Sequence, residues 1–132
     1  MQQVQIEAFS VIIAAILYMI VGFFWYSKWL FGPTWLKLAN MKASEMKHPG
    51  KATFYGAINA LVVAYFLAFF ESYLGVTTVL DGMFVGLTLW LGFVATTQIS
   101  PVIWCKASPK LFLIDTSGKL VSLLVMGGVI GA

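Results

Sequence analysis

Residues 22–35 read GFFWYSKWLFGPTW and join an apolar run to a loop that is rich in lysine. Lys28 lies in this stretch beside four amphipathic rings, which are Trp25, Tyr26, Trp29 and Trp35. Such rings prefer the headgroup layer of a bilayer, where the apolar body lies among acyl chains and the polar N–H or O–H group meets water. We therefore predict that the four rings are interfacial anchors at a membrane boundary, and not the aromatic core of a soluble protein.

The composition also indicates a membrane protein. Of the 132 residues, 61% are hydrophobic and 10% are charged, with a mean hydropathy of +0.92. Soluble domains carry about 25% charged residues, so this chain has too few polar side chains to coat a globule. The length suits one domain, and we predict a single transmembrane domain over residues 1–132. Cys105 is the one cysteine of the chain, which excludes an intrachain disulfide.

Four predominantly apolar runs predict four spanning helices, because about 20 residues are needed to cross about 30 Å of hydrocarbon. Their approximate bounds are 8–28, 52–72, 82–105 and 111–131. Gly32 and Pro33 resemble a helix start, and we expect a short amphipathic helix to follow them along the membrane surface. The predicted fold class is therefore all-α: an integral membrane four-helix bundle with a short interfacial helix in its first loop.

Small residues recur at helical spacing within these spans and predict close helix packing. In lipid, a stripe of small side chains lets a neighbouring backbone approach closely enough for dispersion forces to hold it. The residues that we assign to packing are Gly56, Ala60, Ala64, Gly82, Gly86, Gly92 and Gly127. Asn59 lies beside the stripe of the second span, and we expect an interhelical hydrogen bond from it.

The distribution of lysine predicts the orientation in the membrane. In or beside the first loop lie Lys28, Lys37, Lys42, Lys47 and Lys51, and in the third loop lie Lys106 and Lys110. Because cytoplasmic loops carry an excess of positive charge, we expect a multi-pass protein of the cell membrane with both termini outside the cytoplasm. The lysines of the first loop are candidates for binding anionic lipids, whereas a nucleic-acid partner is not expected.

Several motifs together resemble a known family. They are Gly22-x-x-Trp25-Tyr26-Ser27, Phe31-Gly32 with Trp35, the run WLGFVATT at 90–97, and KLFLI at 110–114 with Met126-Gly127. In these positions the chain resembles the small membrane proteins grouped as domain of unknown function 1761. The family pattern favours Asn followed by Ala-Gly where this chain has Asp115-Thr116-Ser117. The resemblance implies a four-span architecture and no particular chemistry.

Asp115 and Lys119 are the strongest functional candidates, because a charge at mid-membrane costs about 2.5–3.5 kcal/mol on insertion scales. They are four residues apart and share a helix face, so they could form a structural ion pair or line a substrate or ion path. Asn59 and Thr96 would complete such a path. We therefore expect a small oligomeric permeation or transport unit, with a non-transporting accessory or assembly protein of the membrane as the alternative.

The sequence offers little for catalysis, and we expect neither an enzyme nor a cofactor. Ser117-Gly118-Lys119 resembles the end of a phosphate-binding loop, but the earlier glycine of that motif is missing and Leu120 replaces its hydroxyl. His48 has no second histidine or cysteine beside it for a metal site. We assign no catalytic or metal-binding residue.

Overall fold

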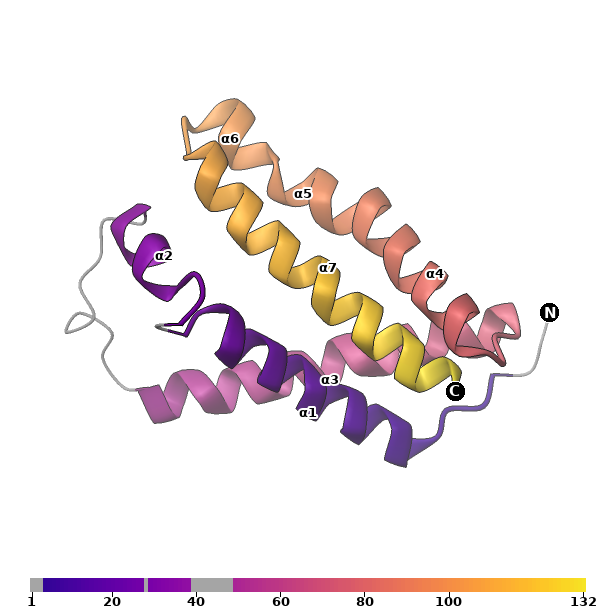
Figure 1. The fold of residues 1–132 in the computed structure, drawn as a ribbon. Coiled ribbons are helices and arrows are strands. Elements are labelled where there is room, and N and C mark those ends of the chain that lie inside the picture. The colour runs from indigo at the N-terminus through magenta and orange to yellow at the C-terminus, as the bar shows by residue number, and fades with distance from the viewer. Residues whose placement is uncertain (1–3, 28, 39–48) are drawn as a thin grey trace.

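The computed structural model describes residues 4–27, 29–38 and 49–132, and all regular elements within these ranges are helices (Figure 1). Lys28, Lys42, Lys47 and His48, which entered the sequence predictions, lie outside the described residues. In chain order the helices are α1 (Ala8–Trp25), α2 (Gly32–Leu38), α3 (Pro49–Leu74), α4 (Val79–Leu89), the π-helix η2 (Trp90–Ala95), α5 (Thr96–Gln98), α6 (Ser100–Trp104) and α7 (Pro109–Gly131).

Four helical rods are long and apolar enough to cross a membrane, and they confirm the predicted fold class. The rods are Ala8–Trp25, Gly50–Leu74, Val79–Trp104 and Pro109–Gly131. The shortest has 18 residues, which corresponds to about 27 Å of α-helix. The third rod is α4 through α6 in near-continuous succession, and it begins three residues before the predicted Gly82. The predicted helix after Gly32 and Pro33 is α2.

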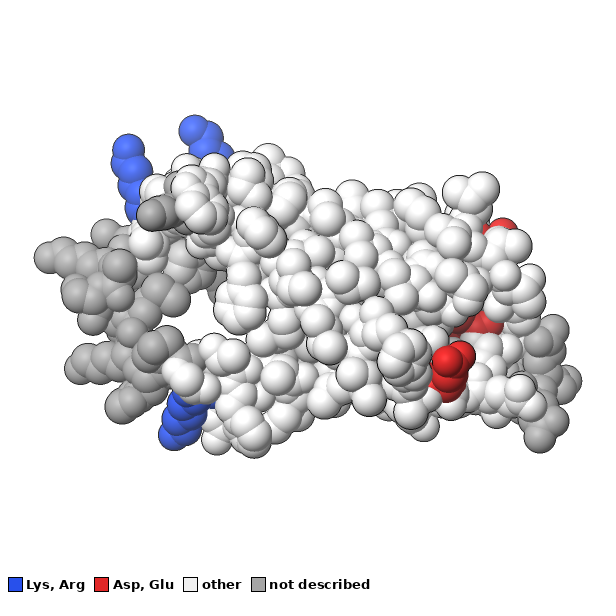
Figure 2. Space-filling model, turned by 60° about the horizontal axis from the view of Figure 1, so that its bottom comes forward, with Lys and Arg blue, Asp and Glu red and all other residues white. Residues whose placement is uncertain are grey.

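On the face that Figure 2 shows, basic and acidic side chains lie at opposite ends of the bundle, and the band of surface between them carries no charged side chain among the described residues. We call one end the basic end, where Lys37, Lys51, Lys106 and Lys110 lie, and the other the acidic end, where Glu7, Glu71 and Asp81 lie. Large apolar side chains are exposed along the band, such as Phe9 at 68%, Phe84 at 67% and Phe66 at 55%. A bilayer would cover such a surface and leave both charged ends in water.

The last helix, α7, is the centre of the bundle. It lies between α1 and the third rod (Figure 1), and 39% of its spanning residues are buried, against 17%, 22% and 17% in the other rods. Yet α7 is also the least apolar of the four rods. In a membrane protein these two facts agree, because polar side chains must face protein and not lipid.

Glycines bring α4 and α7 into backbone contact near the acidic end. A β-carbon on Gly82 would collide with the carbonyl oxygen of Gly127, and one on Gly86 would collide with that of Leu123. On the other side of α7, α1 packs against α3 at Ala60 and Ala64, which are both fully buried. Two further glycines were assigned to packing. A β-carbon added to Gly56 would lie 3.7 Å from the Met19 side chain, which is an ordinary contact, whereas one added to Gly92 would have nothing within 4 Å.

We expect Gly82→Ala to lower the free energy of unfolding by about 1–3 kcal/mol, because an overpacked core must move its backbone apart. Gly92→Ala is the control, since nothing lies within 4 Å of its added β-carbon. Thermal unfolding of the detergent-solubilised protein measures both. Equal stability of the two variants would contradict the close contact between α4 and α7.

Candidate functional site

Residues 114–119 of α7 receive polar contacts from three other parts of the chain, and we call this segment the polar hub. The indole Nε1 of Trp25 on α1 donates a hydrogen bond of 2.8 Å to the carbonyl oxygen of Ile114. The indole Nε1 of Trp90 on η2 donates one of 2.8 Å to the carbonyl oxygen of Thr116. These bonds satisfy both indoles inside the protein and tie α1 and the third rod to one turn of α7.

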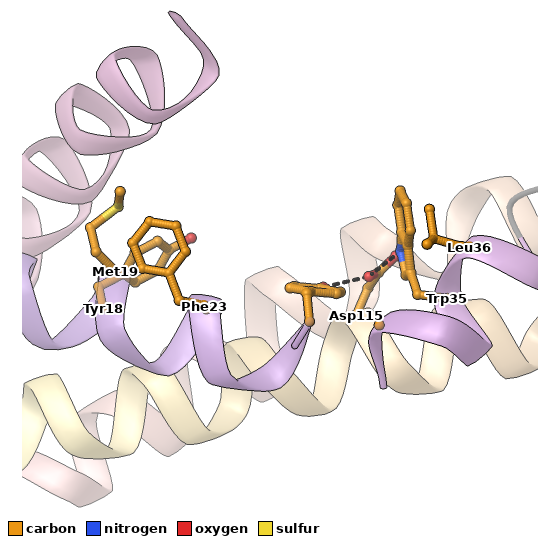
Figure 3. Close-up of a pocket in the computed structure, with 9 residues that line it drawn as sticks. Tyr18, Met19, Phe23, Trp35, Leu36 and Asp115 are labelled. Atoms are coloured by element: carbon orange, nitrogen blue, oxygen red, sulfur yellow. Dashed lines mark hydrogen bonds between the residues drawn. The ribbon is translucent and has the colours of Figure 1, made fainter. Parts of the chain in front are cut away.

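Asp115 is the side-chain acceptor of the hub (Figure 3). Its Oδ1 atom accepts a hydrogen bond of 2.5 Å from the Tyr26 hydroxyl and one of 3.0 Å from the Trp35 indole. Tyr26 directly follows α1, and Trp35 lies in the middle of α2. A single carboxylate oxygen therefore holds the end of α1 and the short helix α2 against α7.

Lys119, one turn further along α7, has a different partner from the one that the sequence suggested. Its Nζ atom donates a hydrogen bond of 2.7 Å to the Tyr18 hydroxyl and lies 5.0 Å from the centre of that ring. Within the described part of the chain, Asp115 and Lys119 form no ion pair with each other. Lys119 instead bonds Tyr18 within α1, and Asp115 bonds Tyr26 directly after that helix.

Tyr26 is held in its neutral, donating form. Burial, and then the hydrogen bond and the negative charge of Asp115, raise the pKa of the Tyr26 phenol above its ordinary value. The phenol therefore keeps its proton well into the alkaline range and continues to donate to Asp115.

A pocket of about 490 Å³ opens between α1, α2 and α7 beside this carboxylate. Figure 3 shows six of its lining residues: Tyr18, Met19, Phe23, Trp35, Leu36 and Asp115. The described residues that form its walls are almost entirely apolar and aromatic, and Asp115 is the one charged residue among them. Such a cavity has the size and character of a small-molecule or lipid-chain site.

The structure does not bring the four predicted path residues together. Asp115 and Lys119 lie one turn apart in the hub, but Asn59 is exposed on α3 and Thr96 is exposed on α5. The Thr96 hydroxyl donates to the carbonyl oxygen of Gly92, one turn earlier in its own rod. A path through one copy of the chain therefore does not connect these residues.

The predicted anchors occupy two different environments. Trp29 is 75% exposed. In contrast, Trp25, Tyr26 and Trp35 give their polar hydrogens to α7. The sequence predictions missed this shared target, did not single out Tyr18, and named Trp90 only as part of a family motif without a structural role. One signal in the sequence pointed to Tyr18. Lys119 lies inside a span and therefore needs a hydrogen-bond acceptor within the protein, and Tyr18 is one of two hydroxyl-bearing residues in α1.

Among the described residues, no group of three or more His, Cys, Asp or Glu side chains lies close enough together to hold a metal ion. A family model described as "Protein of unknown function (DUF1761)" matches residues 9–131. No curated protein and no solved structure matches the chain.

We expect Asp115→Ala to release α2 from α7, because the variant loses the acceptor of two hydrogen bonds, at a cost of about 1–3 kcal/mol. Hydrogen exchange followed by mass spectrometry should show faster exchange in α2 and unchanged exchange in α3. Ser117→Ala is the control, since the Ser117 hydroxyl bonds the Leu113 carbonyl within α7. Unchanged protection of α2 in Asp115→Ala would be evidence against the contact.

We also expect a pH dependence that comes from Tyr26. Because folding raises the Tyr26 pKa, the folded protein keeps a proton that the unfolded chain loses above about pH 10. The contribution of Tyr26 to stability is therefore complete below about pH 10 and is lost as the pH rises further. Unfolding temperatures across the alkaline range should fall less steeply in Tyr26→Phe than in the wild type. Tyr55→Phe, at an exposed position on α3, should fall as steeply as the wild type.

Proposed function

The chain belongs to the DUF1761 family, and we propose that this multi-pass membrane protein binds organic cations with an apolar body in the pocket between α1, α2 and α7. Binding there would be the recognition step of a small permeation or transport unit. The observation that carries the proposal is one carboxylate among described lining residues that are otherwise almost entirely apolar and aromatic.

The second oxygen atom of that carboxylate supports a cationic ligand. Both hydrogen bonds that Asp115 accepts from the described residues end on Oδ1, which leaves Oδ2 without a partner among those residues. Aromatic faces attract cations through their quadrupole, at about 0.5–2 kcal/mol per ring. The rings of Tyr18, Tyr26 and Trp35 line the same pocket. An ammonium or phosphonium group would meet Asp115, while its apolar substituents would replace lipid against Met19 and Phe23.

Lys119 does not occupy this pocket, although it lies one turn from Asp115. Its ammonium group bonds Tyr18 and lies in a separate, narrow crevice of about 20 Å³ beside Trp25 and Gly118. The ammonium group therefore does not line the pocket, although it contacts Tyr18, one of the pocket's three rings named above. It also compensates part of the Asp115 charge within the membrane.

The distribution of charge supports an orientation with the basic end in the cytoplasm. The first residue of α1 and the last residue of α7 lie at the same end of the bundle, opposite α2 and α6 (Figure 1). Both chain ends would then lie outside the cytoplasm, and the pocket would open near the cytoplasmic headgroups.

Transport would require more than one copy of the chain. Asn59 and Thr96 face outward, and a second copy packed against them would cover these polar groups and complete a path of useful width. A homo-oligomer is therefore part of the proposal. A non-transporting accessory protein remains the rival, and it would use the same outward faces for other membrane proteins.

Tetraphenylphosphonium is a suitable probe, because it joins one positive charge to four apolar rings. We expect purified protein to bind it, and Asp115→Asn to weaken binding at least about tenfold, the equivalent of about 1.4 kcal/mol. Asn keeps an oxygen that can accept from Tyr26 and Trp35, so the pocket should persist. Asp81→Asn, at the acidic end, should bind the probe as the wild type does.

Flux separates the two functions. If proteoliposomes take up the probe with the wild type but not with Asp115→Asn, the protein is a transport unit. If the probe binds without flux and other protein chains co-purify from the membrane, the accessory role replaces the transport function. Equal binding by the wild type and Asp115→Asn would overturn the site itself.

A further inference from the structure

A second unusual carboxyl group lies at the opposite end of the bundle from the pocket. Glu71, near the end of α3, is 2% exposed, and its Oε1 and Oε2 atoms are both buried without a hydrogen-bond partner in the described part of the chain. The sequence alone predicts that Glu71 lies at the edge of a short turn. The structure instead places its side chain inside the bundle.

Glycines of the two neighbouring rods make room for this side chain. A β-carbon on Gly82 of α4 would lie 2.6 Å from the Oε1 atom of Glu71, and one on Gly131 of α7 would lie 3.1 Å from it. The carboxyl group therefore lies between α3, α4 and α7, where alanine at either glycine would crowd it.

No cation compensates a charge at this position among the described residues. The titratable groups on the neighbouring segments at this end are Glu7, which lines the same hollow as Glu71, and Asp81, next to Gly82 in the first turn of α4; both are acidic and exposed. On α7, residues 120–131 carry no titratable side chain, and the described lysines of the loops lie at the basic end. Desolvation and repulsion from the acidic neighbours would both destabilise an ionised, unpaired carboxylate at this position. The neutral carboxylic acid is subject to neither effect.

A polar hollow lies beside Glu71. A cavity of about 360 Å³ at the acidic end is lined by Glu71 together with Gln5, Glu7, Ser10, Ser72 and Thr77. Its walls are mostly polar, unlike those of the pocket beside Asp115. Water in this hollow could carry a proton between the aqueous phase and the Glu71 carboxyl group.

We propose that Glu71 is a proton-binding site, in which the buried carboxylate takes a proton from water in the hollow and returns it to the acidic end. The step converts a carboxylate and a hydronium ion into a neutral acid and water. The proposal is independent of cation binding at Asp115, because the two sites lie at opposite ends of the bundle.

The chain has three glutamates, Glu7, Glu45 and Glu71, which permits a specific test. In the double variant Glu7→Gln/Glu45→Gln, carbon-13-labelled glutamate marks Glu71 alone. Infrared spectra of this variant in lipid at neutral pH should show a labelled protonated-carboxyl band, corresponding to one proton per chain. The band should disappear at alkaline pH. A labelled carboxylate band at neutral pH would overturn the proposal.

Two further measurements distinguish a bound proton from a bound metal cation and from a carboxylate that stays ionised. The labelled band should keep its intensity when sodium replaces potassium or is raised in concentration, and its loss on adding sodium would identify a metal-cation site instead. Glu71→Gln should remove a decline in stability that the wild type shows as the pH rises from about 4.3, where a glutamate of the unfolded chain ionises, to the pH at which the buried carboxyl group ionises. Glu7→Gln, which changes an exposed carboxylate of the same hollow, should keep that decline. If Glu71→Gln does not fold, the labelled band alone decides, because it uses a chain that keeps Glu71.

Discussion

Hydrocarbon offers no hydrogen-bond partner, so every polar group within the bilayer must find one inside the protein. Among the described residues, most side-chain hydrogen bonds between different helices of this chain involve α7. The carbonyl oxygens of Ile114 and Thr116 accept two indoles, Asp115 accepts a phenol and a third indole, and Lys119 donates to Tyr18. This requirement explains why the least apolar rod is the most buried one, and why α1, α2 and the third rod all converge on residues 114–119.

The two halves of the bundle are held by different forces. Toward the acidic end, Gly82 and Gly86 let α4 approach the backbone of α7, and dispersion forces act over this short distance. Toward the basic end, polar bonds replace backbone contact: Trp90 reaches Thr116, and the Thr116 hydroxyl donates to Gln98 at 3.0 Å. The third rod becomes π-helical from Trp90 to Ala95, at the junction between these two regions. Such π segments occur often at functional sites.

Local features of the sequence predict the fold well. Apolar runs locate the four rods, and Gly32-Pro33 locates α2, because length and helix-start chemistry act over neighbouring residues. The site depends instead on partners far apart in the sequence: Tyr26 and Asp115 are 89 positions apart. Ring chemistry alone therefore predicted a lipid interface for Trp25 and Trp35, whose polar hydrogens in fact bond α7. Glu71 escaped notice because its burial depends on glycines in two other helices, whereas a carboxylate at the end of a span is ordinarily in water.

The central claim is that α7 is the hydrogen-bond acceptor for the rings around it, and indole exchange tests it most directly. In nitrogen-15 spectra of tryptophan-labelled protein in detergent, the indole protons of Trp25, Trp35 and Trp90 should exchange slowly with water. The indole of Trp104, which is 81% exposed, should exchange fast. Exchange of the Trp25, Trp35 and Trp90 indoles as fast as that of Trp104 would contradict the account.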